Sequence, residues 1–217
     1  MIIEAVNKRY TELSDQECCL SCGGAINFSE VKNGEVCIDL GSGKGSDALR
    51  LANMVGSEGF VYGIDISEGM IEKSKALAQK LMLKNIEFLH NEFEKISLPS
   101  GIADLLISNC SLNHSENKQW VWNEIYRLLK MGGRFVISDI YTLQEVPEEY
   151  RNNSEFIAEC WAGAVTRETY LSQIQNAGFK KIEILEESQA YKKGMIEVCS
   201  WTIAGVKPIQ KCSCCNG

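Results

Sequence analysis

From about residue 35 onward, short runs of apolar residues alternate with segments whose apolar residues recur every three or four positions. The runs at 35–40 and 59–65 are bounded by glycine, as buried strands of a parallel sheet are. A third run, at 103–108, is equally apolar at its centre. Between the first two runs, the apolar positions from Ala48 to Val55 have the spacing of one helix face. The alternation predicts an α/β fold with a mostly parallel sheet and helices on both faces.

Polar residues that can cap a helix mark the starts of three further helices. Ser67 precedes one helix and Thr166 precedes another. Ser115 or Asn117 begins the third, which we expect to end at Gly132–Gly133, where a left-handed cap needs glycine. The other expected elements are strands at Ile86–Leu89 and Arg134–Ile140, an insertion at 143–165, a helix from Arg167 to Ala177, and strands at Lys181–Glu186 and Ile196–Val206 joined by a polar turn at 192–194.

A glycine-rich turn follows the first apolar run. The segment Val36–Leu40 leads into Gly-Ser-Gly-Lys-Gly at 41–45, and Gly-Ile-Asp at 63–65 ends the second run. A strand, a tight turn, a helix and a second strand ending in a carboxylate form a nucleoside-binding crevice in open α/β sheets. Asp65 can accept hydrogen bonds from both hydroxyls of a ribose. Only Lys44 separates the last two glycines, so the spacing differs from the dinucleotide fingerprint.

Length, net charge and cysteine content exclude several classes of protein. The 217 residues are enough for one domain, 1–217, with a good core, and no apolar run has the roughly 20 residues of a membrane helix. A net charge of −7 argues against partners such as nucleic acid or an anionic membrane. Ten cysteines without an apolar leader indicate a cytoplasmic protein with reduced thiols. Those thiols are core residues or ligands for a soft element.

Three cysteines occupy positions where an α/β sheet places its chemistry. Cys110 follows the fourth strand, Cys160 lies in the insertion after the fifth, and Cys22 precedes the first. Carboxyl ends of parallel strands form one rim, so we expect at least Cys110 and Cys160 beside the crevice. Cys37 and Cys199 lie within strands and are expected in the core.

The glycine turn with Gly-Ile-Asp resembles the S-adenosylmethionine-dependent methyltransferases of the Rossmann-like class. Ser-Asn-Cys at 108–110 and Glu-Cys-Trp-Ala-Gly-Ala at 159–164, with segments at 124–133, 138–141 and 146–149, look like the arsenite methyltransferases over roughly residues 20–185. The resemblance implies a class I methyltransferase fold whose seven-stranded sheet has an antiparallel last strand beside the fifth. It also implies trivalent arsenic held by Cys22, Cys110 and Cys160.

The same resemblance implies S-adenosylmethionine as cofactor. Three of its implied contacts have other readings, since Asp47 is also a first-turn acid, Met70 a core residue and Asn109 a turn former. The implied cofactor contacts are Asp39, Gly41, Ser42, Gly43, Gly45, Asp47, Asp65, Ile66, Met70, Glu92, Phe93 and Asn109.

Arsenic chemistry fits the cysteines. Trivalent arsenic is soft and thiolates are soft ligands, so three sulfurs would leave the arsenic lone pair free to take a methyl group without a general base. We expect arsenic as a thiol conjugate and a thiol reductant as partners. One alternative is a small organic acceptor, which needs a base such as His114, although that residue also fits a solvated loop. Another is a thiol-rich binding protein without turnover.

The two ends of the chain add cysteines whose roles stay open. Residues 1–34 form an N-terminal cysteine-bearing cap, where Cys18 and Cys19 rival Cys22 as the ligand. Residues 207–217 form a tail with no regular-structure signal, carrying cysteines at 212, 214 and 215. The tail cysteines, Cys212, Cys214 and Cys215, could pass arsenic to the site, bind zinc with the N-terminal ones, or form a reactive tail. The sequence leaves open the final methylation state, antimony as substrate and the oligomer.

Overall fold

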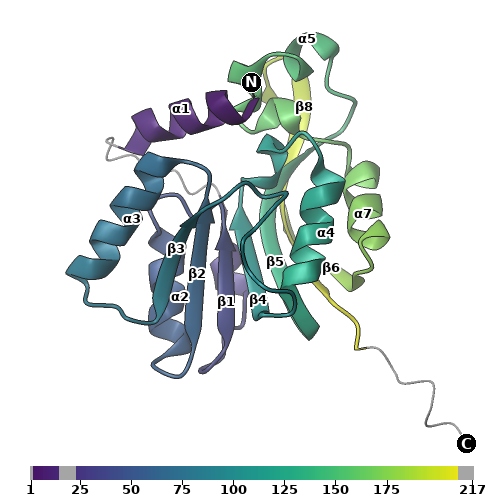
Figure 1. The fold of residues 1–217 in the computed structure, drawn as a ribbon. Coiled ribbons are helices and arrows are strands. Elements are labelled where there is room, and N and C mark those ends of the chain that lie inside the picture. The colour runs from purple at the N-terminus through teal and green to yellow at the C-terminus, as the bar shows by residue number, and fades with distance from the viewer. Residues whose placement is uncertain (1, 15–22, 210–217) are drawn as a thin grey trace, which may run out of the picture.

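The computed structural model describes residues 2–14 and 23–209, which form one mixed sheet with helices on both faces (Figure 1). The strand order is β3-β2-β1-β4-β5-β8-β6, with β7 paired to β8. Strands β1 to β5 pair with one another in parallel, and β8 is antiparallel to both β5 and β6. The strands are β1 Val36–Leu40, β2 Phe60–Asp65, β3 Ile86–His90, β4 Ala103–Asn109, β5 Leu129–Thr142, β6 Lys180–Glu187, β7 Tyr191–Lys193 and β8 Ile196–Val206.

This topology confirms the expected α/β class and the antiparallel last strand beside the fifth. The seven expected strands form the continuous path, and the short β7 is an eighth strand that was not expected. Lys192 and Lys193 pair with β8 rather than forming the turn, which lies at Gly194 and Met195. The polar character of 192–194 signals exposure here, because an exposed edge strand can be as polar as a turn.

Helices cover both faces of the sheet. Helices α2 (Ser46–Val55) and α3 (Glu68–Lys80) pack on one face, and α4 (Lys118–Leu128) and α7 (Arg167–Asn176) pack on the other. The caps follow the sequence, because Ser67, Asn117 and Thr166 each accept a backbone N–H from the first turn of α3, α4 and α7.

The core alternates along the strands. In β1, Cys37 faces the α2–α3 side and Ile38 faces the α4–α7 side, where Trp122, Phe135 and Phe179 pack edge to face. Cys37 and Cys199 are both buried, as expected, and burial raises the pKa of the Cys37 thiol to about 12. These two thiols are therefore core groups.

Helix α4 ends earlier than expected. It stops at Leu128, and Leu129 is already extended and paired with Ala103 of β4. Gly132 has the positive φ that its position suggested, but its N–H donates to Lys207 O, so the glycine shapes the entry to β5 rather than a helix cap. The prediction of a helix reaching Gly132–Gly133 was wrong because Leu129 pairs with β4 instead of continuing the helix.

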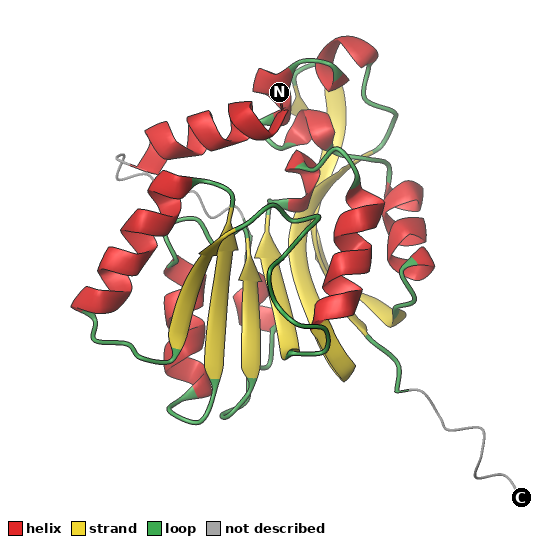
Figure 2. Cartoon of the chain, in the orientation of Figure 1, coloured by secondary structure: helices red, strands yellow, loops and turns green. Residues whose placement is uncertain are grey.

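The segment before the first strand contains a helix that was not predicted. Helix α1 (Ile2–Ser14) lies across the carboxyl ends of the strands, above their arrowheads in Figure 2. It contacts α3, α6 (Ser154–Ile157) and the short helix η2 (Leu112–His114). The other short elements are η1 Ala25–Phe28, α5 Glu148–Arg151 and η3 Trp161–Gly163. Within the described residues, no helix is long and apolar enough to cross a bilayer.

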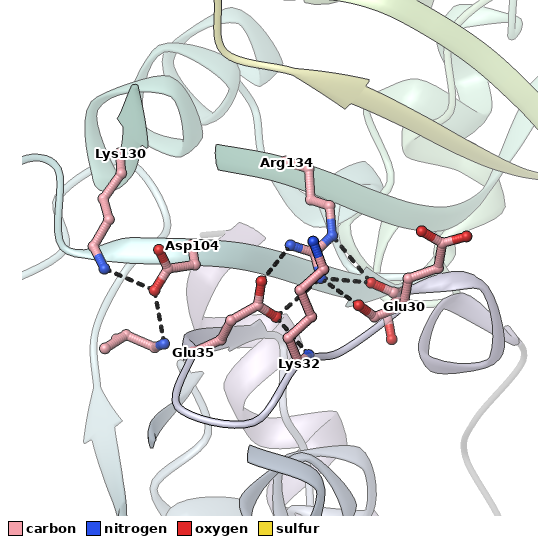
Figure 3. A network of polar contacts seen from close by, with 8 residues as sticks. Glu30, Lys32, Glu35, Asp104, Lys130 and Arg134 are labelled. Carbon is pink, nitrogen blue, oxygen red and sulfur yellow. Dashed lines mark hydrogen bonds and ion pairs between the residues drawn. The ribbon is translucent and has the colours of Figure 1, made fainter. Parts of the chain in front are cut away.

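Ion pairs hold the opposite, amino-terminal end of the sheet (Figure 3). Arg134 at the start of β5 donates to both carboxylate oxygens of Glu35, at 2.7 and 3.0 Å, and to the carbonyls of Ser29 and Glu30. Lys130 pairs with Asp104 of β4 at 2.7 Å. These contacts tie the entry to β1 to the starts of β4 and β5.

Candidate active site

A cavity of about 740 Å³ lies over the carboxyl ends of β1, β2 and β4. Its floor is the glycine turn after β1 and the ends of β2 and β4, and helix α1 contributes Ile3, Val6, Tyr10 and Leu13 to its lining. Ligand sites in open α/β sheets form at this edge, where the strands diverge into separate loops. The fold therefore places the cavity where the sequence motifs predict it.

The glycine turn is held by the neighbouring strand. The N–H groups of Gly41 and Ser42 both donate to Ile64 O, and Gly43 N–H donates to Asp65 Oδ2 at 2.8 Å. All three glycines of the turn have positive φ. A Cβ on Gly41 would overlap Ser111, whereas a Cβ on Gly43 would meet nothing within 4 Å. Gly43 thus presents bare backbone to open space in the cavity.

Buried carboxylates surround this turn. Burial, with repulsion from Asp47 and Asp65, raises the pKa of Asp39 well above its ordinary value. Burial also raises the pKa of Asp65, although Ser67 N–H and Gly43 N–H donate to its two oxygens. Concentrated negative charge with incomplete compensation favours a ligand that brings positive charge or hydroxyl donors.

Asn109 joins the glycine-turn helix to the segment before β1. Its amide nitrogen donates to Asp47 Oδ2 at 2.9 Å, and its amide oxygen accepts Ala25 N–H at 3.2 Å. A Cβ on Gly23 would lie 2.3 Å from Asn109 Oδ1 and 2.5 Å from Ser138 Cβ. The chain at Gly23 therefore packs directly against the carboxyl ends of β4 and β5.

The fold brings two predicted cysteine ligands together. Cys110 directly follows β4 and its N–H donates to Ser138 O, and Cys160 Sγ lies 3.2 Å from Cys110 O. Both cysteines line the cavity, and both have positive φ, which is uncommon for residues with a side chain. Cys160 is buried, and Cys110 is partly exposed to the cavity.

A network of polar groups lies beneath Cys160. Asp139 of β5 is buried and accepts hydrogen bonds from Asn113 Nδ2 at 2.8 Å and Tyr170 Oη at 3.2 Å. Burial raises the pKa of Asp139 to about 7, against the opposing effects of its hydrogen bonds and of the Lys118 charge. Lys118 is also buried, which lowers its pKa to about 8, and its ammonium donates to Ser115 O.

His114 is not the solvated loop residue that its polar surroundings suggested. Its Nδ1 lies 3.0 Å from Ile157 O, so this nitrogen carries the proton, and Nε2 accepts the hydroxyl of Tyr10 at 3.0 Å. Burial lowers the pKa of His114 to about 4 and raises that of Tyr10. The prediction failed because α1, a segment distant in sequence, covers the imidazole.

Most predicted site residues meet at the cavity. Gly45 and Met70 are not among its lining residues: Gly45 packs against Phe88, and Met70 is fully buried in α3. Cys18, Cys19, Cys22, Cys212, Cys214 and Cys215 lie outside the described residues. The predicted residues that line the cavity are Asp39, Gly41, Ser42, Gly43, Asp47, Asp65, Ile66, Glu92, Phe93, Asn109, Cys110 and Cys160.

Sequence reasoning missed the site residues contributed by α1 and the network under Cys160. The spacing of Ile3, Val6, Tyr10 and Leu13 is helical and could have revealed α1. Asp139 gave no comparable signal, because one carboxylate within an apolar strand does not show which way it points. In the part of the chain that the structure describes, no group of three or more His, Cys, Asp or Glu side chains could hold a metal ion.

Comparisons with known proteins agree with this architecture. The family model described as "Methyltransferase domain" matches residues 31–192. The chain is 33% identical over 171 residues to an arsenite methyltransferase of Halobacterium salinarum, covering 79% of this chain and 44% of that protein. It is 38% identical over 151 residues to an arsenite methyltransferase of Mus musculus, covering 65% of this chain and 40% of that protein.

A solved structure shares the fold over nearly the whole chain. It is an arsenic(III) S-adenosylmethionine methyltransferase from Chlamydomonas reinhardtii, with a TM-score of 0.74 and 26% identity, covering 96% of this chain and 74% of that one. The chain spans less than half the length of the two curated relatives. With three quarters of its residues matched by one family model, the chain belongs to the family of methyltransferase domains.

Proposed function

We propose that this protein transfers a methyl group from S-adenosylmethionine to trivalent arsenic held by cysteine thiolates. One observation carries the proposal. Cys110 and Cys160, fifty positions apart in sequence, come together on the wall of a cavity whose floor is the glycine turn with Asp65. The similarity to arsenite methyltransferases supports the same substrate.

The residues at the glycine turn fit S-adenosylmethionine. Gly43 leaves space for close approach, Asp65 offers acceptors to a ribose, and Ser42 Oγ is buried without a hydrogen-bond partner among the described residues. The carboxylates of Asp39 and Asp65 favour a cationic ligand. When bound, S-adenosylmethionine supplies an electrophilic methyl group on a sulfonium sulfur.

The cysteines hold the arsenic substrate. When arsenous acid binds three thiols, three As–S bonds replace three As–O bonds, and the thiol protons leave with the oxygens as three waters. Cys110 and Cys160 provide two sulfurs, and we assign the third to Cys22. Gly23, its neighbour in sequence, packs against Asn109, the residue before Cys110, which supports the assignment. Arsenic keeps its lone pair, so no base is needed to activate it.

Helix α1 shields the reaction from water. Its apolar residues Ile3, Val6 and Leu13 line the cavity, and the Tyr10–His114 hydrogen bond secures the helix above Cys110 and Cys160. His114 has both ring nitrogens engaged and a pKa of about 4, so it is a poor base for an organic acceptor. We place the protein in the reducing cytoplasm, with a thiol reductant and thiol-conjugated arsenic as partners.

The proposal is tested by incubating the reduced protein with S-adenosylmethionine, glutathione and arsenite, and separating the arsenic species by chromatography with elemental detection. We expect methylated arsenic from the parent and at least about 100-fold less from Cys110→Ser and Cys160→Ser. Cys199→Ser is the matched control, because this buried thiol lies in β8 outside the cavity lining. Full activity in both site variants, or arsenite binding without any methylated product, would contradict the proposal.

A further inference from the structure

Asp139 is a buried carboxylate that the proposed reaction does not use. We propose that Asp139 is a positioning residue, which holds the Cys160 thiol in place beside Cys110. This inference rests on the proposed function, in which Cys160 binds arsenic.

Cys160 sits in a backbone conformation that needs outside support. Its φ of 76° and ψ of −42° are unfavourable for a residue with a Cβ. Its N–H donates to Ile157 O at 2.8 Å, which fixes the backbone. Its Sγ has two oxygen neighbours, Cys110 O at 3.2 Å and Asp139 Oδ1 at 3.8 Å. The sulfur thus lies between Cys110, the residue after β4, and Asp139 of β5.

Asp139 is itself fixed from several elements. Its Oδ1 accepts Ile140 N–H and Asn113 Nδ2, both at 2.8 Å, and its Oδ2 accepts the Tyr170 hydroxyl. Asn113 lies in η2, three residues after Cys110, and Tyr170 lies in α7. The carboxylate therefore joins β5, η2 and α7 at the point where Cys160 meets the sheet.

Asn113 extends this support to the residues that follow Cys160. Its amide nitrogen also donates to Ile140 O at 2.8 Å. Gly163 in η3 packs so closely on Asn113 that a Cβ there would lie 2.0 Å from Asn113 O. Asp139, through Asn113, thus supports the insertion just after Cys160. Groups that orient a ligand in this way contribute to affinity without touching the bound atom.

Two substitutions separate positioning from charge. Asp139→Asn keeps an oxygen that can accept from Asn113 and Ile140, and its amide nitrogen can face the Tyr170 hydroxyl. Asp139→Ala removes every contact. Tyr170→Phe removes only one hydrogen bond to Asp139 and provides a milder variant if Asp139→Ala does not fold. Asp104→Ala, at the other end of β4, is the matched control for general destabilisation.

The probe is phenylarsine oxide, which binds a pair of thiols, and the parent and all variants carry serine in place of Cys18, Cys19, Cys212, Cys214 and Cys215 so that the closely spaced thiols at the chain ends do not bind it. Two As–S bonds form, and the two thiol protons leave with the arsenic-bound oxygen as water. We expect Asp139→Ala to weaken this binding by about 10- to 100-fold, as loss of outer-shell support does at metal sites. Asp139→Asn and Asp104→Ala should stay within about twofold of the parent, and Tyr170→Phe should lose about two- to fivefold.

A second readout does not depend on arsenic being the substrate. The rate at which iodoacetamide alkylates Cys160, located by mass spectrometry, should rise in Asp139→Ala relative to that of Cys110 and stay near the parent value in Asp139→Asn. Unchanged alkylation and arsenical binding in Asp139→Ala, or in Tyr170→Phe if the alanine variant does not fold, would overturn the proposal. So would an asparagine variant as impaired as the alanine one. A parent that alkylates as expected but makes no methylated arsenic would refute the proposed function alone.

Discussion

The pKa values of carboxyl groups are shifted in opposite directions at the two ends of the sheet. At the amino-terminal end, burial is the largest effect on Glu35 and acts to raise its pKa. The hydrogen bonds from Arg134 and from Lys32 N–H, together with the charge of Arg134, hold the pKa below its ordinary value. At the carboxyl-terminal end, burial raises the pKa of Asp39, Asp65 and Asp139, and the hydrogen bonds to Asp65 and Asp139 come from neutral donors. The surroundings at the amino-terminal end stabilise the charged carboxylate, whereas burial at the carboxyl-terminal end destabilises it.

This difference separates the part of the molecule that holds the fold from the part that binds. A paired charge stabilises the free protein and has little left to offer a ligand. A buried carboxylate with incomplete compensation destabilises the free protein, and a ligand that supplies donors or positive charge relieves it. Substitutions at the two ends should therefore change different properties, and four of them test the distinction.

Asp65→Ala should have the largest effect of the four, and the affected quantity should be the affinity for S-adenosylmethionine. Each hydrogen bond from a ribose hydroxyl to the carboxylate is worth about 1.5 kcal/mol, so losing two should weaken S-adenosylmethionine binding by about 100-fold. Isothermal titration calorimetry measures this directly. A variant that binds within about threefold of the parent would remove Asp65 from the cofactor site.

Arg134→Ala should lower the free energy of unfolding by about 2 kcal/mol, because it removes the hydrogen bonds that Arg134 donates to Glu35 and to two carbonyl groups. Affinity for S-adenosylmethionine should not change, since Arg134 lies at the far end of the sheet. Urea denaturation and calorimetry on the same preparation give both quantities. A loss of affinity with unchanged stability would break the comparison.

His114 should make stability depend on pH below neutrality. Its folded pKa of about 4 lies below the unfolded value of 6.5, so between these values the unfolded chain binds a proton that the folded protein does not. Stability is therefore lost as pH falls through this window. The stability advantage of the parent over His114→Gln should shrink by about 3 kcal/mol between pH 7 and pH 4. An advantage that stays constant would mean that His114 titrates normally.

Asp39→Asn should have the smallest effect, with a sign opposite to that of Arg134→Ala. A carboxyl whose folded pKa is raised gives full stability below its unfolded pKa of 3.8 and loses it as pH rises. Removing the charge should therefore raise the free energy of unfolding by about 1 kcal/mol at pH 8 and leave it unchanged at pH 3. Thermal unfolding at both pH values checks this, and a loss of stability at pH 8 would show that the charge is compensated.

Local patterns predicted the parts of the site that belong to one short segment. The apolar run before Gly41, the carboxylate at Asp65 and the cysteine after β4 needed only strand periodicity and the rule that ligands bind at carboxyl ends. Cys160 joined them because its position after the fifth strand places it at the same rim.

Contacts between distant segments could not be derived in this way. His114 lies in a polar stretch typical of a solvated loop, and only the packing of α1 over it reveals its burial. The end of α4 at Leu128 depends on pairing between Leu129 and Ala103, a competition that local glycine signals do not report. The role of Asp139 depends on Asn113 and Tyr170, which approach it only in the folded chain.

X-ray absorption at the arsenic edge tests the central claim most directly. Arsenite is added, without free thiols, to reduced protein in which Cys18, Cys19, Cys212, Cys214 and Cys215 are replaced by serine. It should exchange its oxygen neighbours for three sulfurs, and Cys160→Ser should lower the number of sulfurs while Cys199→Ser leaves it at three. A spectrum that keeps oxygen neighbours, or one that Cys160→Ser does not alter, would contradict the claim that the carboxyl-terminal end of this sheet is an arsenic site.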